Sequence, residues 1–272
     1  MNVSLPPLTV AALLAAVSAS AAEIEATDLY NLPAADVVFL GEVHDNPVHH
    51  AHQAIAVGAI GAKALVFEML TDAQALRITP ELLRSEQGLE ATLAWQNSGW
   101  PEFAMYYPIF IATDARAIFG GALERDEVRR AVSDGAAEVF GDAAPLFGLT
   151  EPLDDAEQVV REAGQKAAHC DALPVSMLGG MVEAQRLRDA AMARAVIAAI
   201  AETGGPVAVI TGNGHVRGDW GVPRALRRAA PDLTVLTIGQ FESTPDPKTP
   251  FDLWLVSDPV KRPDPCDTFD QR

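Results

Sequence analysis

Five short runs rich in valine, isoleucine and leucine constrain the fold of this chain most. The runs are Asp36–Leu40, Ala64–Phe67, Val207–Ile210, Leu233–Ile238 and Leu253–Val256. They are nearly continuous in their apolar character, as expected of strands that helices cover on both faces of a parallel sheet. Helical segments lie between them, so the alternation predicts an α/β fold with a mainly parallel sheet flanked by helices.

Two of the intervening helices have clear boundaries. Pro47 to Ile60 has Pro47 at its first position and Asn46 before it as the N-cap, which is a favourable start. Leu178 to Thr203 is long and rich in alanine and arginine, and it ends at Gly204-Gly205-Pro206.

The segment from about Thr71 to Pro174 departs from this alternation. It contains the helical pieces Ala73–Ile78 and Asp126–Ala137, together with turn signals at Gly99-Trp100-Pro101 and Gly120-Gly121. We therefore expect residues 71–174 to form a mostly helical insertion, or cap, within a single domain of residues 23–272.

The first 22 residues have the form of an export signal. Leu8 to Val17 is an apolar run of about ten residues, too short to span a bilayer, and small residues follow it up to Ala22. Met1 to Pro7 contains no lysine or arginine, which leaves an Ala-rich helix that stays with the domain as the alternative. No cysteine stands at the junction for lipid attachment, so we expect a periplasmic protein without membrane insertion after removal of the signal.

Charge and cysteine content exclude several classes of protein. The chain has 20 basic and 37 acidic residues, a formal net charge of −17, which argues against nucleic acid and against an anionic membrane surface as partners. Its two cysteines, Cys170 and Cys266, exclude a cysteine-rich zinc module. In an oxidising compartment they could pair and close a long loop worth about 4 kcal/mol. The alternative is two unrelated thiols.

Polar residues follow three of the predicted strands. Glu42 and His44 come after the first strand, Glu68 follows the second, and His215 follows the third within Thr211–Arg217. The carboxyl ends of parallel strands share one edge, where ligands bind, so these four side chains are expected in one crevice. The alternative is that strand-end carboxylates cap helix N-termini, which could account for one of them.

The histidines are concentrated beside this predicted crevice. Four of the six fall between His44 and His52, and two of these, His49 and His50, lie in the first turn of the predicted helix. A helix N-terminus disfavours imidazolium, so we expect both to stay neutral. The sequence contains no HExxH pattern of a zinc protease and no G-x-S-x-G nucleophile elbow. Gly212-x-Gly214 lacks the third glycine of a dinucleotide-binding motif.

Separated blocks of the sequence resemble one known family. The first block is Leu40-Gly41-Glu42-Val43-His44-Asp45-Asn46-Pro47 with His49-His50. The others are Phe67-Glu68-Met69, Trp95, Gly99-Trp100-Pro101, Tyr106-Tyr107-Pro108, His169-Cys170, Met181, Ala184-Gln185, Arg188-Asp189-Ala190, Met192-Ala193, Gly212-Asn213-Gly214-His215-Val216-Arg217 and Gly221-Val222-Pro223. Together they make the chain similar to the ChaN-like haem-binding uptake proteins of the Tiki superfamily.

The resemblance implies a haem-binding α/β core with a helical cap, a tyrosine as iron ligand and a homodimer that encloses two haems face to face. Tyrosinate is an established ligand of haem iron. Tyr106, two residues before Pro108, fits the family's Tyr-x-Pro position best, with Tyr107 as the adjacent alternative. His49, His50 and Arg217 are the candidates for binding the propionates. The alternative for the Trp100–Phe110 stretch is an apolar cap that packs on the core.

The wider superfamily carries a second implication, because its erythromycin esterases and Tiki proteases are hydrolases with similar strand-end residues. Here His44 would act as general base, oriented by Glu42 or Glu68, and His215 would assist as an acid or electrostatic stabiliser. A divalent metal held by Glu68, His44 and His215 is a variant of the same idea. The two hypotheses are therefore a haem carrier for iron uptake and a hydrolase of the esterase or metal-dependent peptidase type.

Overall fold

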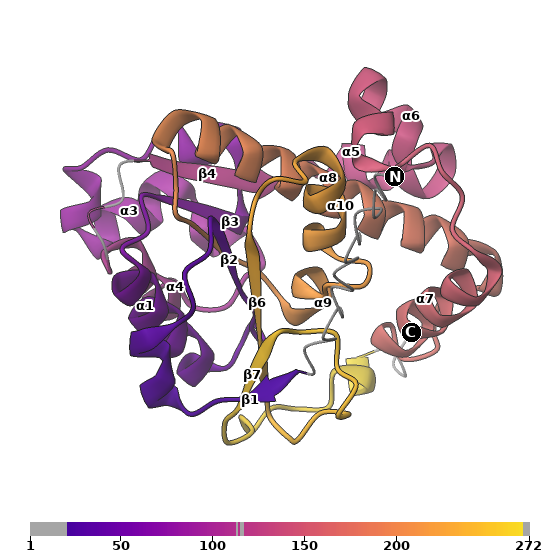
Figure 1. The fold of residues 1–272 in the computed structure, drawn as a ribbon. Coiled ribbons are helices and arrows are strands. Elements are labelled where there is room, and N and C mark those ends of the chain that lie inside the picture. Colours follow the sequence, from indigo (N-terminus) through magenta and orange to yellow (C-terminus); the bar gives the residue numbers. More distant parts are fainter. Residues whose placement is uncertain (1–20, 113, 115–116, 269–272) are drawn as a thin grey trace, which may run out of the picture.

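A central parallel sheet organises the molecule (Figure 1). In the computed structural model, residues 21–112, 114 and 117–268 are described, and they form a seven-stranded sheet in the order β1-β7-β6-β2-β5-β3-β4, with every pairing parallel. The strands are β1 (Ala22–Glu23), β2 (Val37–Leu40), β3 (Ala64–Thr71), β4 (Ala117–Ala122), β5 (Val207–Ile210), β6 (Val235–Phe241) and β7 (Leu253–Val256). All five predicted strands are present, and the predicted α/β class is confirmed.

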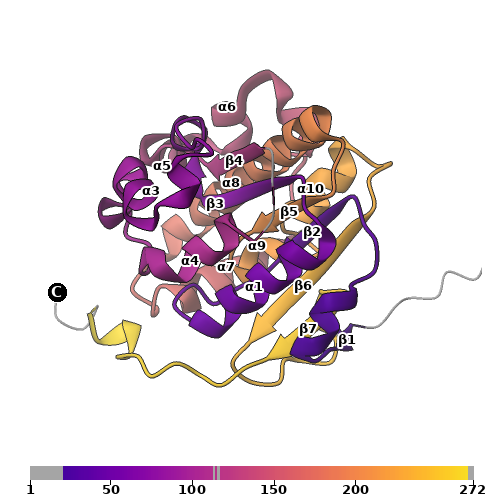
Figure 2. The ribbon, with the colours of Figure 1, turned by 90° about the vertical axis from the view of Figure 1, so that its left-hand side faces the viewer.

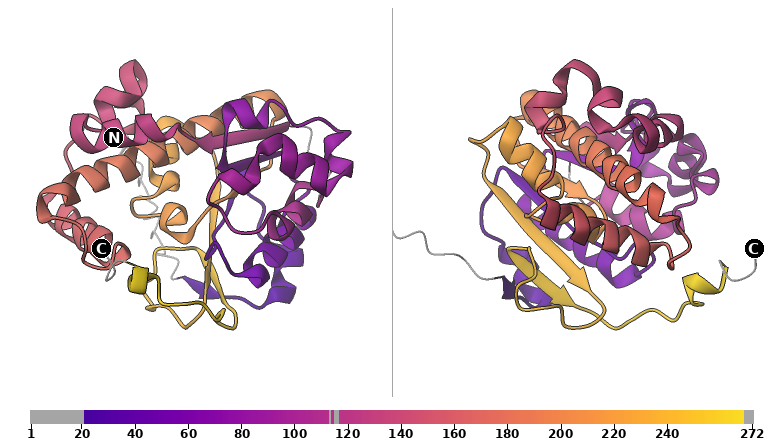
Figure 3. Two further views of the ribbon diagram at one scale, coloured as in Figure 1. Left: turned by 180° about the vertical axis from the view of Figure 1, so that it is seen from behind. Right: turned by 90° about the vertical axis from the view of Figure 1, so that its right-hand side faces the viewer.

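Helices cover both faces of this sheet. They are α1 (Pro47–Ile60), α2 (Asp72–Ala75), α3 (Glu86–Leu93), α4 (Phe103–Phe110), α5 (Arg125–Asp134), α6 (Ala136–Phe140), α7 (Asp155–Ala168), α8 (Val175–Thr203), α9 (Asn213–Val216) and α10 (Val222–Ala229). Figure 2 shows α1, α3 and α4 on one side of the sheet, and the right-hand view of Figure 3 shows the long α8 on the other.

Alternate residues of each central strand enter two separate cores. Val37 and Phe39 of β2 pack in the core shared with α8, whereas Val38 and Leu40 pack in the core shared with α1 and α4. Successive side chains of a strand point to opposite faces, so a strand buried on both faces must be apolar throughout. This is the physical reason that the strands were visible in the sequence as continuous apolar runs.

The predicted boundaries of α1 agree with the structure. The Asn46 side chain accepts a hydrogen bond from the Val48 amide, and Gly61 ends the helix in the left-handed conformation at φ 60°. Helix α8 begins at Val175, one turn before the prediction, and ends at Thr203 as predicted.

The interpretation of Gly120-Gly121 as a turn is wrong, because both glycines lie inside β4, the strand that pairs with β3 at one end of the sheet. A Cβ atom on Gly120 would lie 2.2 Å from the carbonyl carbon of Thr71. The glycine therefore marks a close approach of two backbones within the sheet. Residues 71–174 are otherwise rich in helix.

The two cysteines form a disulfide, as the sequence suggested. The Cys170–Cys266 bond joins the residues after α7 to the segment that follows β7, across 96 positions of the chain. Most of the predicted signal peptide, residues 1–20, lies outside the described residues. Within the described ranges, no helix is both long enough and apolar enough to cross a membrane.

Candidate functional site

The carboxyl edge of the sheet brings together the strand-end residues that the sequence singled out. Strands β2, β5 and β3 are adjacent, so the residues after β2 and β5 meet the second half of β3 at one edge of the sheet. Glu42, Glu68 and His215 are buried there, and His44 is partly exposed. They form two carboxylate–imidazole pairs, Glu42 with His44 and Glu68 with His215.

The first pair is centred on the carboxylate of Glu42. His44 Nδ1 lies 2.7 Å from Glu42 Oε1, and the same oxygen accepts a hydrogen bond of 2.9 Å from the Tyr106 hydroxyl. Glu42 Oε2 accepts from Gln53 Nε2 at 2.8 Å and lies 3.5 Å from His50 Nδ1. Helix α1, the loop after β2 and helix α4 thus converge on one buried carboxylate.

Electrostatics favour a proton on the His44 ring. Burial lowers the pKa of His44, but the hydrogen bond to Glu42 and the negative charges of Glu68 and Glu42 outweigh this effect, so the pKa is raised overall. The ring packs edge-on against Trp100, with 4.9 Å between the ring centroids. Glu42 and Trp100 therefore fix the imidazole from two sides.

The other ring nitrogen of His44, Nε2, has no hydrogen-bond partner among the described residues, and the side chain is 38% exposed. Gly212 lies beside it, where an added Cβ atom would be only 2.9 Å from both Cε1 and Nε2. The Gly212 backbone is therefore packed close to that edge of the imidazole, and only glycine fits there.

The second pair belongs to a closed cluster around Glu68. Oε1 of Glu68 accepts a hydrogen bond from Arg188 and lies 3.4 Å from His215 Nε2. Oε2 accepts from the Thr211 hydroxyl at 2.6 Å and from the Gly212 amide at 2.8 Å. Burial raises the pKa of Glu68, but His215, Arg188 and His44 lower it more, to about 2, so the group is an anion at neutral pH.

His215 is enclosed on its other side by α8. Its Nδ1 atom lies 2.6 Å from Asp189 Oδ1 and 3.1 Å from Gln185 Nε2. Burial raises the pKa of Asp189 even though His215 opposes that shift, and Asp189 Oδ2 lies 4.0 Å from Arg161. Both nitrogens of His215 are therefore engaged with protein groups.

Sequence reasoning did not assign roles to Gln185, Arg188 and Asp189. Arg188 and Asp189 follow Gln185 by three and four residues on α8, so they lie on the side of the helix that carries Gln185, and that side meets the carboxyl edge of the sheet. The sequence does show these three polar residues close together on a helix otherwise rich in alanine. Only the topology shows that this stripe lies against Glu68 and His215.

The divalent metal proposed for Glu68, His44 and His215 is not supported. No group of three or more histidine, cysteine, aspartate or glutamate side chains in the described ranges is arranged to hold a metal ion. The physical reason is that Arg188 already occupies one oxygen of Glu68, while Asp189 and Gln185 occupy His215.

Tyr106, the favoured iron ligand, is completely buried. Its hydroxyl donates to Glu42, and its pKa is raised far above the ordinary value by burial and by the charge of that carboxylate. Ligation requires tyrosinate with an accessible oxygen. Tyr107 donates to the Leu83 carbonyl at 2.9 Å, and Tyr30 is 61% exposed near the N-terminus. Ligation of the iron by Tyr106 stays a prediction. The burial of its hydroxyl against Glu42 does not favour it.

The predicted propionate partners are occupied by other protein groups. His49 accepts from the Val43 amide and contacts Ser257, and burial lowers its pKa to about 4, which keeps it neutral. His50 Nε2 lies 2.7 Å from the His44 carbonyl oxygen. Arg217 binds Asp219 through two nitrogens and stacks on Trp220, 3.6 Å from the ring centroid.

A cavity of about 690 Å³ adjoins this edge through Trp100, which both lines it and contacts His44. Its walls carry Arg77, Arg125 and Arg129, together with Glu124 and Asp126. Arg129 pairs with Asp126, but the Arg77 guanidinium has no partner among the described residues. Arg125 donates to the Ser98 carbonyl, so Arg77 is the arginine of this lining without a protein partner among the described residues.

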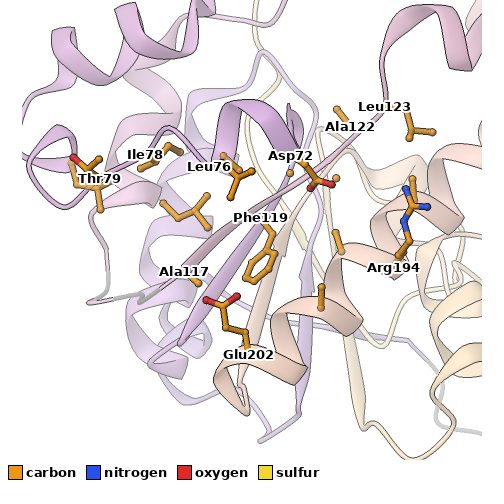
Figure 4. Close-up of a pocket in the computed structure, with 18 of the residues that line it drawn as sticks. Asp72, Leu76, Ile78, Thr79, Ala117, Phe119, Ala122, Leu123, Arg194 and Glu202 are labelled. Atoms are coloured by element: carbon orange, nitrogen blue, oxygen red, sulfur yellow. The ribbon is translucent and has the colours of Figure 1, made fainter.

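A second cavity, of about 640 Å³, lies along β4 (Figure 4). Phe119 of β4 and the small residues of α8 make it largely apolar, with Arg194 and Glu202 among the polar residues of its lining. It is separate from the carboxyl-edge site, because none of Glu42, His44, Glu68 and His215 lines it.

The fold is an α/β fold whose polar cluster lies at the carboxyl ends of parallel strands, the edge at which ligands bind in such folds. A model of the haem-binding uptake family ChaN, of the Tiki superfamily, matches residues 29–226. The chain belongs to this family, as the sequence motifs indicated. No curated protein matches the chain.

One solved structure agrees with the fold. The chain is similar to ChaN of Campylobacter jejuni, described as binding haem cofacially, with a TM-score of 0.58 and 17% identity over 83% of this chain and 88% of that one. The type III effector HopBA1 gives a TM-score of 0.43 and 12% identity over 82% and 88% of the two chains. A succinoglycan biosynthesis protein gives 0.38 and 12% over 79% and 67%. The last two scores are too low to indicate a shared fold.

Proposed function

We propose that this protein binds haem and serves haem or iron uptake in the periplasm, as a homodimer. Membership of the haem-binding uptake family is the observation that carries the proposal. The likeness to a ChaN fold that binds haem cofacially suggests the same pairing of two haems between two copies of this chain.

Groups at and beside the edge site suit a haem. His44 offers a partly exposed imidazole, and the adjoining cavity offers Arg77 and Arg125 for the propionates. Arginine is the preferred partner of a carboxylate, because its planar fork of donors matches the two oxygens. These residues supply local positive charge on an acidic protein. When bound, the haem would supply an iron centre, and its role here is that of cargo.

The disulfide supports export. Such bonds persist in oxidising compartments and are rare in the bacterial cytosol. We expect the mature protein in a periplasmic fraction, with its N-terminus at Ala22 or Glu23, which N-terminal sequencing measures directly.

Titration with haemin tests the proposed function. The purified chain, with its disulfide intact, should give a saturable change in the visible spectrum at one haem per protomer, and sedimentation should show a dimer in the loaded state. A spectrum that follows free haemin throughout would refute haem binding. A loaded monomer would refute only the pairing of two haems.

The hydrolase alternative is not favoured by the comparisons. The geometry adds a reason, because His215, the proposed acid or stabiliser, is held on both ring nitrogens by buried protein groups. The Glu42–His44 pair therefore has no available second imidazole from the residues that follow β5.

A further inference from the structure

Two buried side chains of opposite charge each present one atom without a hydrogen-bond partner. They are Arg161 of α7 and Asp189 of α8, whose side chains are 5% and 3% exposed. Nη2 of Arg161 and Oδ2 of Asp189 lie 4.0 Å apart, too far for a direct hydrogen bond, and neither has another hydrogen-bond partner among the described residues. A buried polar atom in this state destabilises a protein unless a water molecule or a bound ligand satisfies it.

The remaining polar atoms of both side chains are held in place. Arg161 Nη1 donates to Glu157 at 3.2 Å, and the guanidinium lies over the Trp220 ring, 5.7 Å from its centroid. Asp189 Oδ1 lies 2.6 Å from His215 Nδ1. The two unpaired atoms therefore keep fixed positions, as a binding site requires.

Both side chains line a cavity of about 70 Å³ beside α8, against which α7 and α10 pack (Figure 1). The cavity offers several times the space that one water molecule needs, but far less than a drug-sized ligand needs. Its lining has four arginines against two acidic side chains, namely Arg161, Arg186, Arg224 and Arg228 against Glu151 and Asp189. A small cavity with this charge favours a small anion.

The unpaired atoms restrict which anion fits. The other three arginines of the lining already have carboxylate partners, so Arg161 Nη2 is the donor left for a ligand. An anion bound there would also lie beside Asp189 Oδ2. A carboxylate oxygen and an anion that can only accept hydrogen bonds repel each other. The anion must therefore carry a hydroxyl group that donates to Asp189.

We propose that this cavity binds a small oxyanion that carries a hydroxyl group, of the class of hydrogen phosphate and hydrogen carbonate. One oxygen of the ion accepts from Arg161 Nη2 and its hydroxyl donates to Asp189 Oδ2, so both unpaired atoms gain a partner. The site lies behind His215, which contacts Asp189 through Nδ1 and faces Glu68 through Nε2. The proposal does not depend on haem binding.

Calorimetric titration of the full chain at pH 8 tests the proposal without any variant. Hydrogen phosphate and sulfate are then both tetrahedral dianions that differ by one proton, so sulfate is the matched control ion. We expect phosphate or bicarbonate to bind at least about tenfold more tightly than sulfate, because sulfate leaves Asp189 Oδ2 unpaired. The tighter of the two identifies the ion. Equal affinities for phosphate, bicarbonate and sulfate, or no binding of any, would overturn the proposal and assign the cavity to water.

Variants then locate the bound ion. Asp189→Asn replaces Oδ2 by an amide that donates, while Oδ1 can still accept from His215, so the preference over sulfate should disappear. Arg161→Met should weaken binding by about tenfold or more. Arg194→Met is its control, because Arg194 is an exposed arginine of α8 outside this cavity. An unchanged preference in folded Asp189→Asn, or equal affinities in the two arginine variants, would overturn the assignment.

Discussion

The carboxyl edge of the sheet holds two carboxylate–histidine pairs that differ in one respect. His44 is 38% exposed and has a free nitrogen, whereas His215 is 6% exposed and both of its nitrogens are engaged. The residue types and the position in the fold are the same. The difference teaches that the partners of the second nitrogen decide whether such a pair is closed within the protein or has a nitrogen left without a protein partner.

The closed pair, Glu68 with His215, should contribute more to the free energy of unfolding than the other pair does. Glu68 is ionised with a pKa of about 2, against an ordinary value of 4.5, because Arg188 and His215 hold its charge. Replacing Glu68→Gln removes about 3 kcal/mol from the free energy of unfolding, which denaturant titration at pH 7 measures. A loss below about 1 kcal/mol would show that the Glu68 charge is not stabilised as described.

The same group predicts a pH dependence with a definite sign. The pKa of Glu68 is depressed in the folded state, so its contribution is fully present above pH 4.5 and is lost as the pH falls towards about 2. Between these values the free energy of unfolding should decrease more steeply in the wild type than in Glu68→Gln. Equal slopes in the two proteins would contradict the assignment.

The other pair, Glu42 with His44, should affect haemin binding rather than the free energy of unfolding. Glu42→Gln keeps the shape of the side chain but removes the charge behind His44 Nδ1. We expect haemin affinity to fall by about 10–100-fold, because the carboxylate that orients the partly exposed imidazole is lost. The midpoint potential of the bound haem should rise, since less negative charge then stabilises ferric iron. If Glu68→Gln weakens haemin binding as much as Glu42→Gln does, the distinction between the pairs fails.

A smaller effect is expected from crowding the free nitrogen. Gly212 has φ −62° and ψ 150°, which alanine adopts readily, so Gly212→Ala adds a methyl group beside His44 Nε2 without backbone strain. Haemin affinity should fall by about tenfold, or 1.4 kcal/mol. Gly214→Ala is the matched control, because an added Cβ atom there meets no other atom within 4 Å. Equal affinities in the two variants would place the ligand elsewhere.

The sequence predicted the parts of this molecule that depend on local pattern. Strands such as β2 and β5 are buried on both faces and therefore apolar throughout, and α1 has the cap residue and proline that begin a helix. The same reasoning placed Glu42, His44, Glu68 and His215 at one edge. It missed β4, because Gly120 and Gly121 have the composition of a turn although a close backbone approach requires them.

The state of each site residue could not be predicted, because it depends on contacts between distant parts of the chain. The Tyr106 hydroxyl meets Glu42 across 64 positions, and Arg188 meets Glu68 across 120. A pattern of residue types shows that a tyrosine, a histidine and two carboxylates are available. Only the packing of α4 and α8 on the sheet shows which of these groups are already paired.

Haemin titration of a chain without tyrosine tests the central claim most directly. The protein has three tyrosines, so the triple variant Tyr30→Phe, Tyr106→Phe and Tyr107→Phe removes every candidate tyrosinate ligand and leaves His44 in place. After circular dichroism has shown that this variant is folded, it should still bind haemin saturably at one haem per protomer, because Tyr106 is buried and Tyr107 donates to the Leu83 carbonyl. Loss of saturable binding in the folded variant, with binding retained in His44→Ala, would contradict the account.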